Sequence, residues 1–202
     1  MGSASLSPES ITAANAVLAG LRPFPVAVTT VDGGVANGLI SLSAGSAGIV
    51  PELPRATVSL TKYNHTHDML IRSGVFAMHM LSAGEGEIDK SLEILMTLAG
   101  CSGRDGDKIS RLRTKTGVTG APILLDAHSY VECRVTGTLD NDENTVFVGD
   151  VVAADVFSTA HRLRINEAWA KLPREWIEAY EANHLPQVEH ARRMRAEAAR
   201  SS

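Results

Sequence analysis

Two tight turns between segments rich in β-branched residues constrain the fold of this chain most. Asp32-Gly33-Gly34 separates residues 25–31 from residues 35–43, and glycine tolerates the positive φ that hairpin turns need. A polar segment, residues 140–144, separates two further β-rich stretches in the same way. Strands joined by tight turns pair antiparallel. The sequence therefore predicts an antiparallel sheet, and it lacks the strand–helix alternation of a doubly wound fold.

The remaining elements suit a β-barrel with helices around it. Strands are expected at residues 56–61, 75–81, 123–125, 129–139 and 145–157, and helices at residues 7–19, 66–72 and 87–98. A strand count near seven at this length suggests a closed or partly closed barrel. Residues 44–48 are small and polar, which predicts a loop or bulge.

Ala, Glu and Arg dominate from Asn166 onward, and Pro173 and Pro186 predict two helix starts there. The 202 residues favour one domain, since chains usually divide above roughly 250 residues. We expect an N-terminal helix over residues 1–21, a barrel over 22–160 and a C-terminal helical tail of the same domain over 161–202. Leu172, Trp176 and Tyr180 form an apolar stripe that would cover either a partner subunit or the chain's own barrel.

Charge and cysteine content argue against several classes of function. The net charge is −4, from 19 basic and 23 acidic residues, whereas nucleic-acid binders usually carry a basic excess. No apolar run is long enough for a membrane span, and the first residues lack the features of a secretory signal. Cys101 and Cys133 indicate reduced thiols and a cytoplasmic location, and they cannot form the usual four-ligand zinc site. No metal is expected.

Residues 62–68, Lys-Tyr-Asn-His-Thr-His-Asp, lie between a strand end and a helix start. The first turn of a helix presents free N–H groups and the positive end of the helix dipole, so a phosphate can bind there. Lys62, Asn64 and Thr66 would add a charge, an amide and a hydroxyl. The alternative is an ordinary helix capped by Asn64 or Thr66.

Two further segments could contact a ligand. Residues 37–46 form a strand that runs into small residues and exposes main-chain groups of the kind that read the edge of a flavin ring. In Ser102-Gly-Arg-Asp-Gly-Asp-Lys108, Arg104 could bind a phosphate or stack on a planar ring. Each segment has an ordinary explanation too: a bulged strand end and a surface turn. His79 and His128 lie inside strand patterns and are expected to be packing residues.

Taken in chain order, these three segments resemble the flavin reductase-like family of FMN-binding split barrels. The resemblance rests on Asn37-Gly38-Leu39, Asn64-His-Thr-His67, Ser73-Gly-Val-Phe76, Ser102-Gly-Arg-Asp-Gly-Asp-Lys108, Gly120-Ala-Pro-Ile-Leu124, Val131-Glu-Cys133 and Val148-Gly-Asp-Val151. The similarity spans about residues 22–157. No single motif is specific, but their ordered spacing is.

The resemblance implies a mainly β (α+β) fold: a six-stranded antiparallel Greek-key split β-barrel with flanking helices and a C-terminal helical tail, assembled as a homodimer. FMN would lie in a groove near the subunit interface. Its isoalloxazine would contact the backbone of Leu39, Ile40, Ser41, Leu42 and Ser43. Thr61, Lys62, Asn64, Thr66 and His67 would hold its phosphate, and Ser102, Gly103 and Arg104 would close over it.

The family likeness also implies an activity: a flavin reductase that takes a hydride from NADH or NADPH, with FMN as cofactor and FAD or riboflavin as further flavin substrates. Reduced flavin would pass to a partner such as a flavin-dependent monooxygenase. The hydride would pass directly from the nicotinamide to the flavin, and the protein would orient the two rings. No catalytic acid or base is assigned.

Two departures from the family pattern bear on the use of nicotinamide. Many relatives carry a histidine in the last hairpin, where this chain has Asp142-Glu143-Asn144, and the turn at residues 50–55 is longer by about two residues. The alternatives are therefore an FMN-binding electron-transfer or flavin-carrier protein without NAD(P)H oxidase activity, a flavoenzyme that reduces an organic substrate, and a structural dimer without cofactor.

Overall fold

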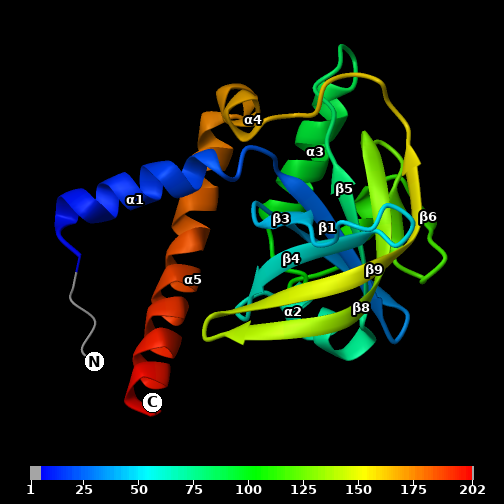
Figure 1. Ribbon diagram of the computed structural model, residues 1–202. Coiled ribbons are helices and arrows are strands. Elements are labelled where there is room, and N and C mark those ends of the chain that lie inside the picture. The colour runs from blue at the N-terminus through cyan, green and yellow to red at the C-terminus, as the bar shows by residue number, and fades with distance from the viewer. Residues whose placement is uncertain (1–5, 202) are drawn as a thin grey trace.

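A seven-stranded antiparallel sheet forms the body of the protein. Figure 1 shows the computed structural model, which describes residues 6–201. The sheet has the order β2-β1-β5-β8-β9-β4-β3. Its strands are β1 Val26–Asp32, β2 Val35–Ser41, β3 Ala44–Ser46, β4 Arg55–Thr61, β5 Val75–Met80, β8 Ser129–Asn141 and β9 Asn144–Val156. A separate two-stranded sheet pairs β6 Thr114–Thr116 with β7 Pro122–Leu124.

The sheet closes on itself where the chain bends at Leu42 and Ser43. β2 and β3 are separated by only these two residues, yet they lie at opposite edges of the sheet order. The Ser59 N–H of β4 donates to the Ser43 carbonyl at 2.8 Å, and the Ser41 hydroxyl accepts from the Ser43 N–H at 3.1 Å. Counted as one bent strand, β2 and β3 bring the barrel to six strands. The predicted split-barrel fold is confirmed, but the expected loop is a strand at Ala44–Ser46.

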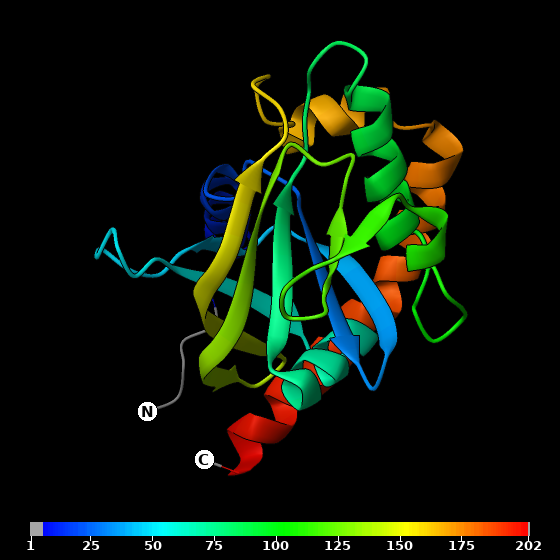
Figure 2. The same cartoon turned by 90° about the vertical axis from the view of Figure 1, so that its right-hand side faces the viewer.

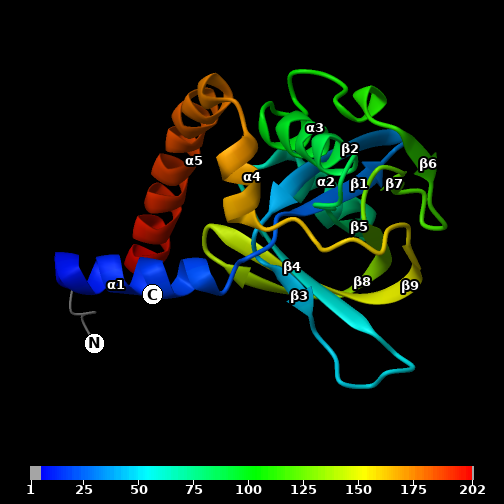
Figure 3. The ribbon, with the colours of Figure 1, turned by 90° about the horizontal axis from the view of Figure 1, so that it is seen from above.

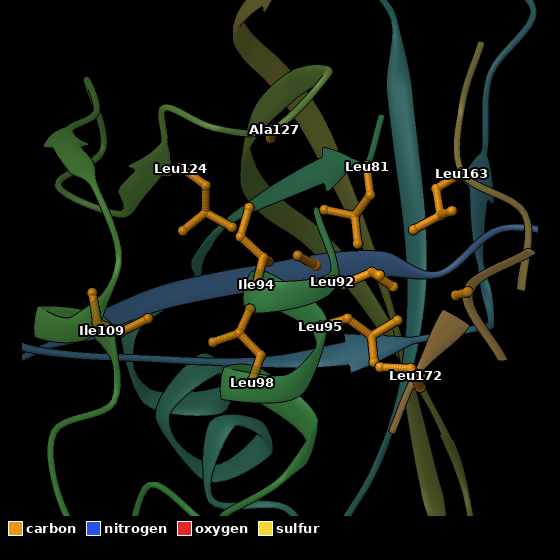
Figure 4. Close-up of a cluster of buried hydrophobic side chains, with 12 residues drawn as sticks. Leu81, Leu92, Ile94, Leu95, Leu98, Ile109, Leu124, Ala127, Leu163 and Leu172 are labelled. Atoms are coloured by element: carbon orange, nitrogen blue, oxygen red, sulfur yellow. The ribbon is translucent and has the colours of Figure 1, made fainter. Parts of the chain in front are cut away.

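Apolar residues fill both the inside of the barrel and the space beneath α3 (Ile88–Ala99). Val26 and Val28 of β1 point into the barrel with Phe76 and Phe147, whereas Ala27 faces the second cluster. Figure 4 shows that second cluster, in which leucines of α3 meet Leu81, Leu124, Leu163 and Leu172. β1 is therefore buried on both faces, which explains its unbroken run of apolar and β-branched residues.

Shorter helices close the ends of the barrel. α2 (His65–Ser73) follows β4 and ends at Gly74, whose φ of 64° is the left-handed conformation that glycine favours at a helix end. A 3₁₀ turn, Ile109–Arg111, follows the loop after α3. Figure 2 shows β5, β8 and β9 side by side on the face with α2 below and the β6–β7 pair next to α3.

The C-terminal tail consists of α4 (Ile165–Lys171) and one long helix, α5 (Arg174–Ser201). The predicted helix start at Pro186 is wrong, because Pro186 lies inside α5. Proline removes one intrahelical hydrogen bond at a cost of about 3 kcal/mol, so side-chain contacts on both sides must hold the helix together. Leu172 is buried and Trp176 packs on the second cluster, so the apolar stripe covers the chain's own barrel.

α1 (Pro8–Gly20) begins as predicted, with the Ser7 hydroxyl accepting from the Ser10 N–H at 3.2 Å. No residue of this helix is buried, and it projects away from the barrel past α5 (Figures 1 and 3). Leu6, Ile11, Val17 and Leu18 remain exposed. None of the helices within residues 6–201 combines the length and apolar character that a membrane crossing requires.

Candidate functional site

A cavity of about 570 Å³ lies between the β2–β3 bend and the C-terminal helix. Its size falls within the range of about 300–1,000 Å³ that is usual for cofactor sites. Four main parts of the chain line it: Leu39–Ser43 at the bend, the strand end and turn from Thr61 to Thr66 without Lys62, the loop at residues 98–105, and α5 at Tyr180, Asn183, His184, Pro186 and Gln187. Arg22, Asn37, Lys108 and Asn144 add single side chains to the lining. Segments far apart in the sequence thus meet at one concave site.

Main-chain groups form one wall of the cavity, which we call the floor (Leu39–Ser43). The ladder between β2 and β1 ends at the pair Ser41–Val26, so the peptide groups of Leu42 lie beyond it. The ordered bend keeps this backbone fixed through the Ser43–Ser59 bond. A planar ligand with donors and acceptors on its edge fits such a wall, because main-chain N–H and C=O groups can pair with that edge.

The first turn of α2 faces the cavity without a side-chain cap. Asn64 has the extended conformation of an N-cap residue, but its side chain makes no capping bond. Its amide donates instead to the Thr61 hydroxyl. The free N–H groups of the first helical turn are therefore available to an anion, which the helix dipole also favours.

Asn37 connects α2 to the loop that follows α3. Its Nδ2 donates to the Thr66 hydroxyl at 3.2 Å, while its Oδ1 is a buried side-chain atom without a partner among the described residues. A methyl group added at Gly103 would overlap the Asn37 carboxamide, so the loop lies directly against it. An unsatisfied buried acceptor is costly, and a ligand hydroxyl or N–H group is the kind of partner it lacks.

Arg104 joins that loop to the start of α2. Its Nη1 donates to the Tyr63 carbonyl at 3.0 Å, and its Nη2 donates to Asp68 Oδ2 at 3.0 Å. Arg22, Arg104 and Lys108 line the cavity, and the carboxylates of Asp105, in the lining, and Asp68, paired with Arg104, leave a small excess of positive charge. A positive site in a chain of net charge −4 attracts anionic ligands.

Lys108 fixes the base of the same loop. Its buried ammonium donates to the carbonyls of Leu98 and Cys101, both at 2.9 Å, and burial lowers its pKa to about 8. A cation suits the end of α3, because the last carbonyls of a helix are its negative pole. The loop at residues 100–107 is thereby tied down at both ends.

The structure brings most of the predicted site residues to this cavity. Leu39, Ile40, Ser41, Leu42, Ser43, Thr61, Asn64, Thr66, Ser102, Gly103 and Arg104 all line it. Lys62 and His67 do not. The Lys62 ammonium pairs with Asp140 at 2.7 Å, and the buried His67 ring shares hydrogen bonds with Thr145 and Asp68.

Sequence analysis did not place any residue of α5 at the cavity. Tyr180 is the last residue of the predicted stripe of Leu172, Trp176 and Tyr180, and His184 lies one turn further along the helix. Extending that period to His184 would have pointed to these residues, although nothing in the sequence shows what the stripe faces.

Comparison with known proteins identifies the family. Residues 20–168 match the Flavin reductase like domain. The chain belongs to this family. A curated relative, the ferric-chelate reductase (NAD(P)H) of Archaeoglobus fulgidus, is 30% identical over 107 residues. The match covers 52% of this chain and 60% of the reductase, so the chain spans less than two thirds of that relative.

Several solved structures share the fold. An NADH:FAD oxidoreductase from Streptomyces globisporus C-1027 superposes with a TM-score of 0.62 at 20% identity, covering 80% of this chain and 86% of the other. A nitrilotriacetate monooxygenase component B homologue from Mycobacterium thermoresistibile gives 0.60 at 19% identity, covering 83% and 94%. The family match includes the floor, α2 and the loop after α3, whereas α5 lies outside residues 20–168.

Proposed function

We propose that this chain is an FMN-dependent flavin reductase that transfers a hydride from NADH or NADPH to flavin. The observation that carries the proposal is the cavity itself. It combines a main-chain floor, the uncapped first turn of α2 and a surplus of cationic side chains. FMN has two different ends. Its ring carries an edge of hydrogen-bonding groups, which a main-chain floor can pair with. Its phosphate is a monoanion or dianion, which the first turn of α2 and the cationic side chains can bind.

The residues fit such a ligand in distinct roles. Leu39–Ser43 would bind the edge of the isoalloxazine through their backbone. Thr61, Asn64 and Thr66, with the first N–H groups of α2, would hold the phosphate. Ser102, Gly103 and Arg104 would close the site, while Lys62 and His67 would support it from outside the cavity. When bound, FMN would supply the ring that accepts the hydride.

A second function, an FMN-binding electron carrier without NAD(P)H oxidase activity, is favoured by the β8–β9 hairpin. Asn144 lines the cavity there, and the neighbouring Glu143 carboxylate is occupied by Arg195 at 2.5 and 2.7 Å. This hairpin therefore offers the cavity an amide and no free titratable group.

Assembly and partners belong to the same proposal. The exposed apolar residues of α1 and the exposed Ile49 and Leu53 support a homodimer, because clustered exposed apolar side chains often mark interaction sites. The relation to a monooxygenase component B homologue supports delivery of reduced flavin to a partner oxygenase. Free Cys101 and Cys133 support a reducing compartment, the cytoplasm.

The test begins with the visible spectrum of the purified protein, followed by NADH and NADPH oxidation with FMN, FAD or riboflavin. Flavin absorbance together with turnover supports the reductase. Flavin binding without turnover supports the carrier, and no flavin binding contradicts both.

The phosphate position is tested by the double substitution Asn64→Ala with Thr66→Ala. We expect FMN binding to weaken by about 1–3 kcal/mol, since hydrogen bonds to a charged group would be lost. The exposed Thr116→Ala is the control. Unchanged FMN affinity in the double variant would place the phosphate elsewhere.

A further inference from the structure

The rings of the C-terminal tail form a stacked column that ends at the cavity. Trp176 and Tyr180 stack at 5.3 Å with an interplanar angle of 12°, and Tyr180 and His184 stack at 6.0 Å and 11°. Trp169 packs edge-on against Trp176 and Tyr180, at 85° to each. The column is therefore half-buried at Trp169 and Trp176 and open at the exposed His184 ring.

Helix α5 is held across the cavity at both ends. Near its start, Leu172 and Trp176 pack on the core beneath α3. Near its other end, Arg195 binds Glu143 and His190 makes an edge contact with Tyr63 at 5.5 Å. The intervening turns, from Tyr180 to Gln187, thus form a fixed roof over the floor at Leu39–Ser43.

Polar groups on the roof have no partner within the part of the chain that the structure describes. Asn183 and Gln187 line the cavity, and their carboxamides make no hydrogen bond to residues 6–201. Arg22 lines the same cavity and uses its Nε to bind the Leu18 carbonyl, which leaves its terminal nitrogens available. The roof thus offers an open ring face, two carboxamides and a nearby cation.

We infer that the roof is the binding subsite for the hydride donor, with the open face of the His184 ring stacking on its nicotinamide ring and Tyr180 holding the His184 ring in place from behind. This inference rests on the proposed reductase function. A nicotinamide ring is planar and carries a carboxamide, which Asn183 and Gln187 can pair with. The dinucleotide also carries a pyrophosphate, which suits Arg22. Tyr180, Asn183, His184 and Gln187 are positioning and specificity residues here, supplied by a segment outside the family match.

The chain provides its own reporter for this subsite. It contains two tryptophans, and both belong to the ring column. Titration of the flavin-loaded protein with NAD⁺, which does not react with oxidised flavin, should therefore change the tryptophan fluorescence. The same titration gives a dissociation constant that does not depend on turnover.

The decisive variants are His184→Ala and the double substitution Tyr180→Ala with His184→Ala. The double variant should raise the dissociation constant for NAD⁺ and the KM for NADH about tenfold, the range expected when one ring contact and the ring that supports it are lost. FMN affinity should stay unchanged, and kcat should change less than KM. Tyr180→Phe keeps the ring and should retain NAD⁺ binding, which tests the positioning role of that ring. The exposed Glu181→Ala on the same helix is the control that should behave like the wild type. His184 is exposed, so its single variant should fold even if the double variant does not.

Each other outcome overturns the inference. Equal NAD⁺ binding and equal KM in all variants would mean that the roof does not hold the nicotinamide, while the reductase function would stand. Weaker FMN binding with unchanged NAD⁺ binding would assign the column to the flavin. A wild type that neither binds NAD⁺ nor oxidises NADH or NADPH would refute both this inference and the reductase function.

Discussion

The ion pair between Arg195 and Glu143 should control how firmly helix α5 covers the cavity. Arg195 Nε lies 2.7 Å from Glu143 Oε2, and Nη2 lies 2.5 Å from Oε1. Asn144 Nδ2 also donates to this carboxylate, at 3.2 Å. Arg195→Ala therefore removes two charge-assisted hydrogen bonds that join the end of α5 to the β8–β9 hairpin.

Solvent exposure sets the size of the effect. The Glu143 side chain is 10% exposed and the Arg195 side chain 64%. Exposed pairs contribute about 0–1 kcal/mol, whereas breaking a fully buried pair costs about 3–5 kcal/mol. This pair lies between those limits, so we expect a coupling energy of about 1–2 kcal/mol.

A double-mutant cycle of Arg195→Ala and Glu143→Ala, followed by urea unfolding, measures that energy. Hydrogen exchange of the α5 amides should increase about tenfold in Arg195→Ala, since 1.4 kcal/mol corresponds to a factor of ten. Arg192→Ala, which breaks an exposed pair with Glu189 on the same helix, is the control. A coupling energy indistinguishable from zero, with unchanged exchange in α5, would refute the reasoning.

The same pair predicts an acid effect. Arg195 lowers the pKa of the Glu143 carboxyl through hydrogen bonding. A lowered folded-state pKa gives stability that is present above the ordinary pKa and is lost as pH falls through the folded value. As pH falls, the α5 amides of the wild type should therefore lose their protection from hydrogen exchange at a higher pH than the β1 amides. Glu143→Gln should remove this difference in pH dependence between α5 and β1.

Three further outcomes are expected. Gly103→Ala should weaken flavin binding at least about tenfold without unfolding the protein, because the methyl group would displace the Asn37 carboxamide; an unchanged fluorescence titration would contradict this. Cys101 is exposed, whereas burial raises the pKa of Cys133 to about 12, so one thiol should react with a thiol reagent in the native protein and two after unfolding. Burial lowers the pKa of His79 to about 4, so below about pH 6.5 the unfolded chain binds a proton that the folded chain does not. The free energy of unfolding should therefore fall by about 3 kcal/mol between pH 6.5 and pH 4. If His79→Gln shows the same dependence of stability on pH, the prediction is wrong.

Local sequence patterns were enough to predict most of the barrel. The turn at Asp32–Gly34 and the polar hairpin at residues 140–144 lie where they were expected, because turn chemistry and β-branched runs are local properties. β3 was missed because Ala44–Ser46 has no strand pattern of its own, and its pairing with β4 follows from the bend. Pro186 was misread for a similar reason, since distant contacts keep α5 continuous despite the proline.

The candidate site shows the same division between local and distant information. Residues at the floor, on α2 and in the loop after α3 could be named, because each segment carries a motif whose order in the chain is specific. The roof could not be assigned, because the position of Tyr180 and His184 depends on two anchors, the core beneath α3 and the Glu143 carboxylate. Lys62 and His67 belong to a matching motif, yet their side chains turn to Asp140 and Thr145.

The position of α5 in the chain has a consequence for biosynthesis. All strands of the barrel are complete at Val156, whereas the helix that covers the cavity begins at Arg174. Chains emerge from the ribosome from the N-terminus onward, at about 5–20 residues per second. The floor therefore leaves the ribosome first, the loop after α3 second and the roof last. For some seconds the cavity of the barrel is not covered by α5. A bulky ligand can enter from the side during this interval, before the roof exists.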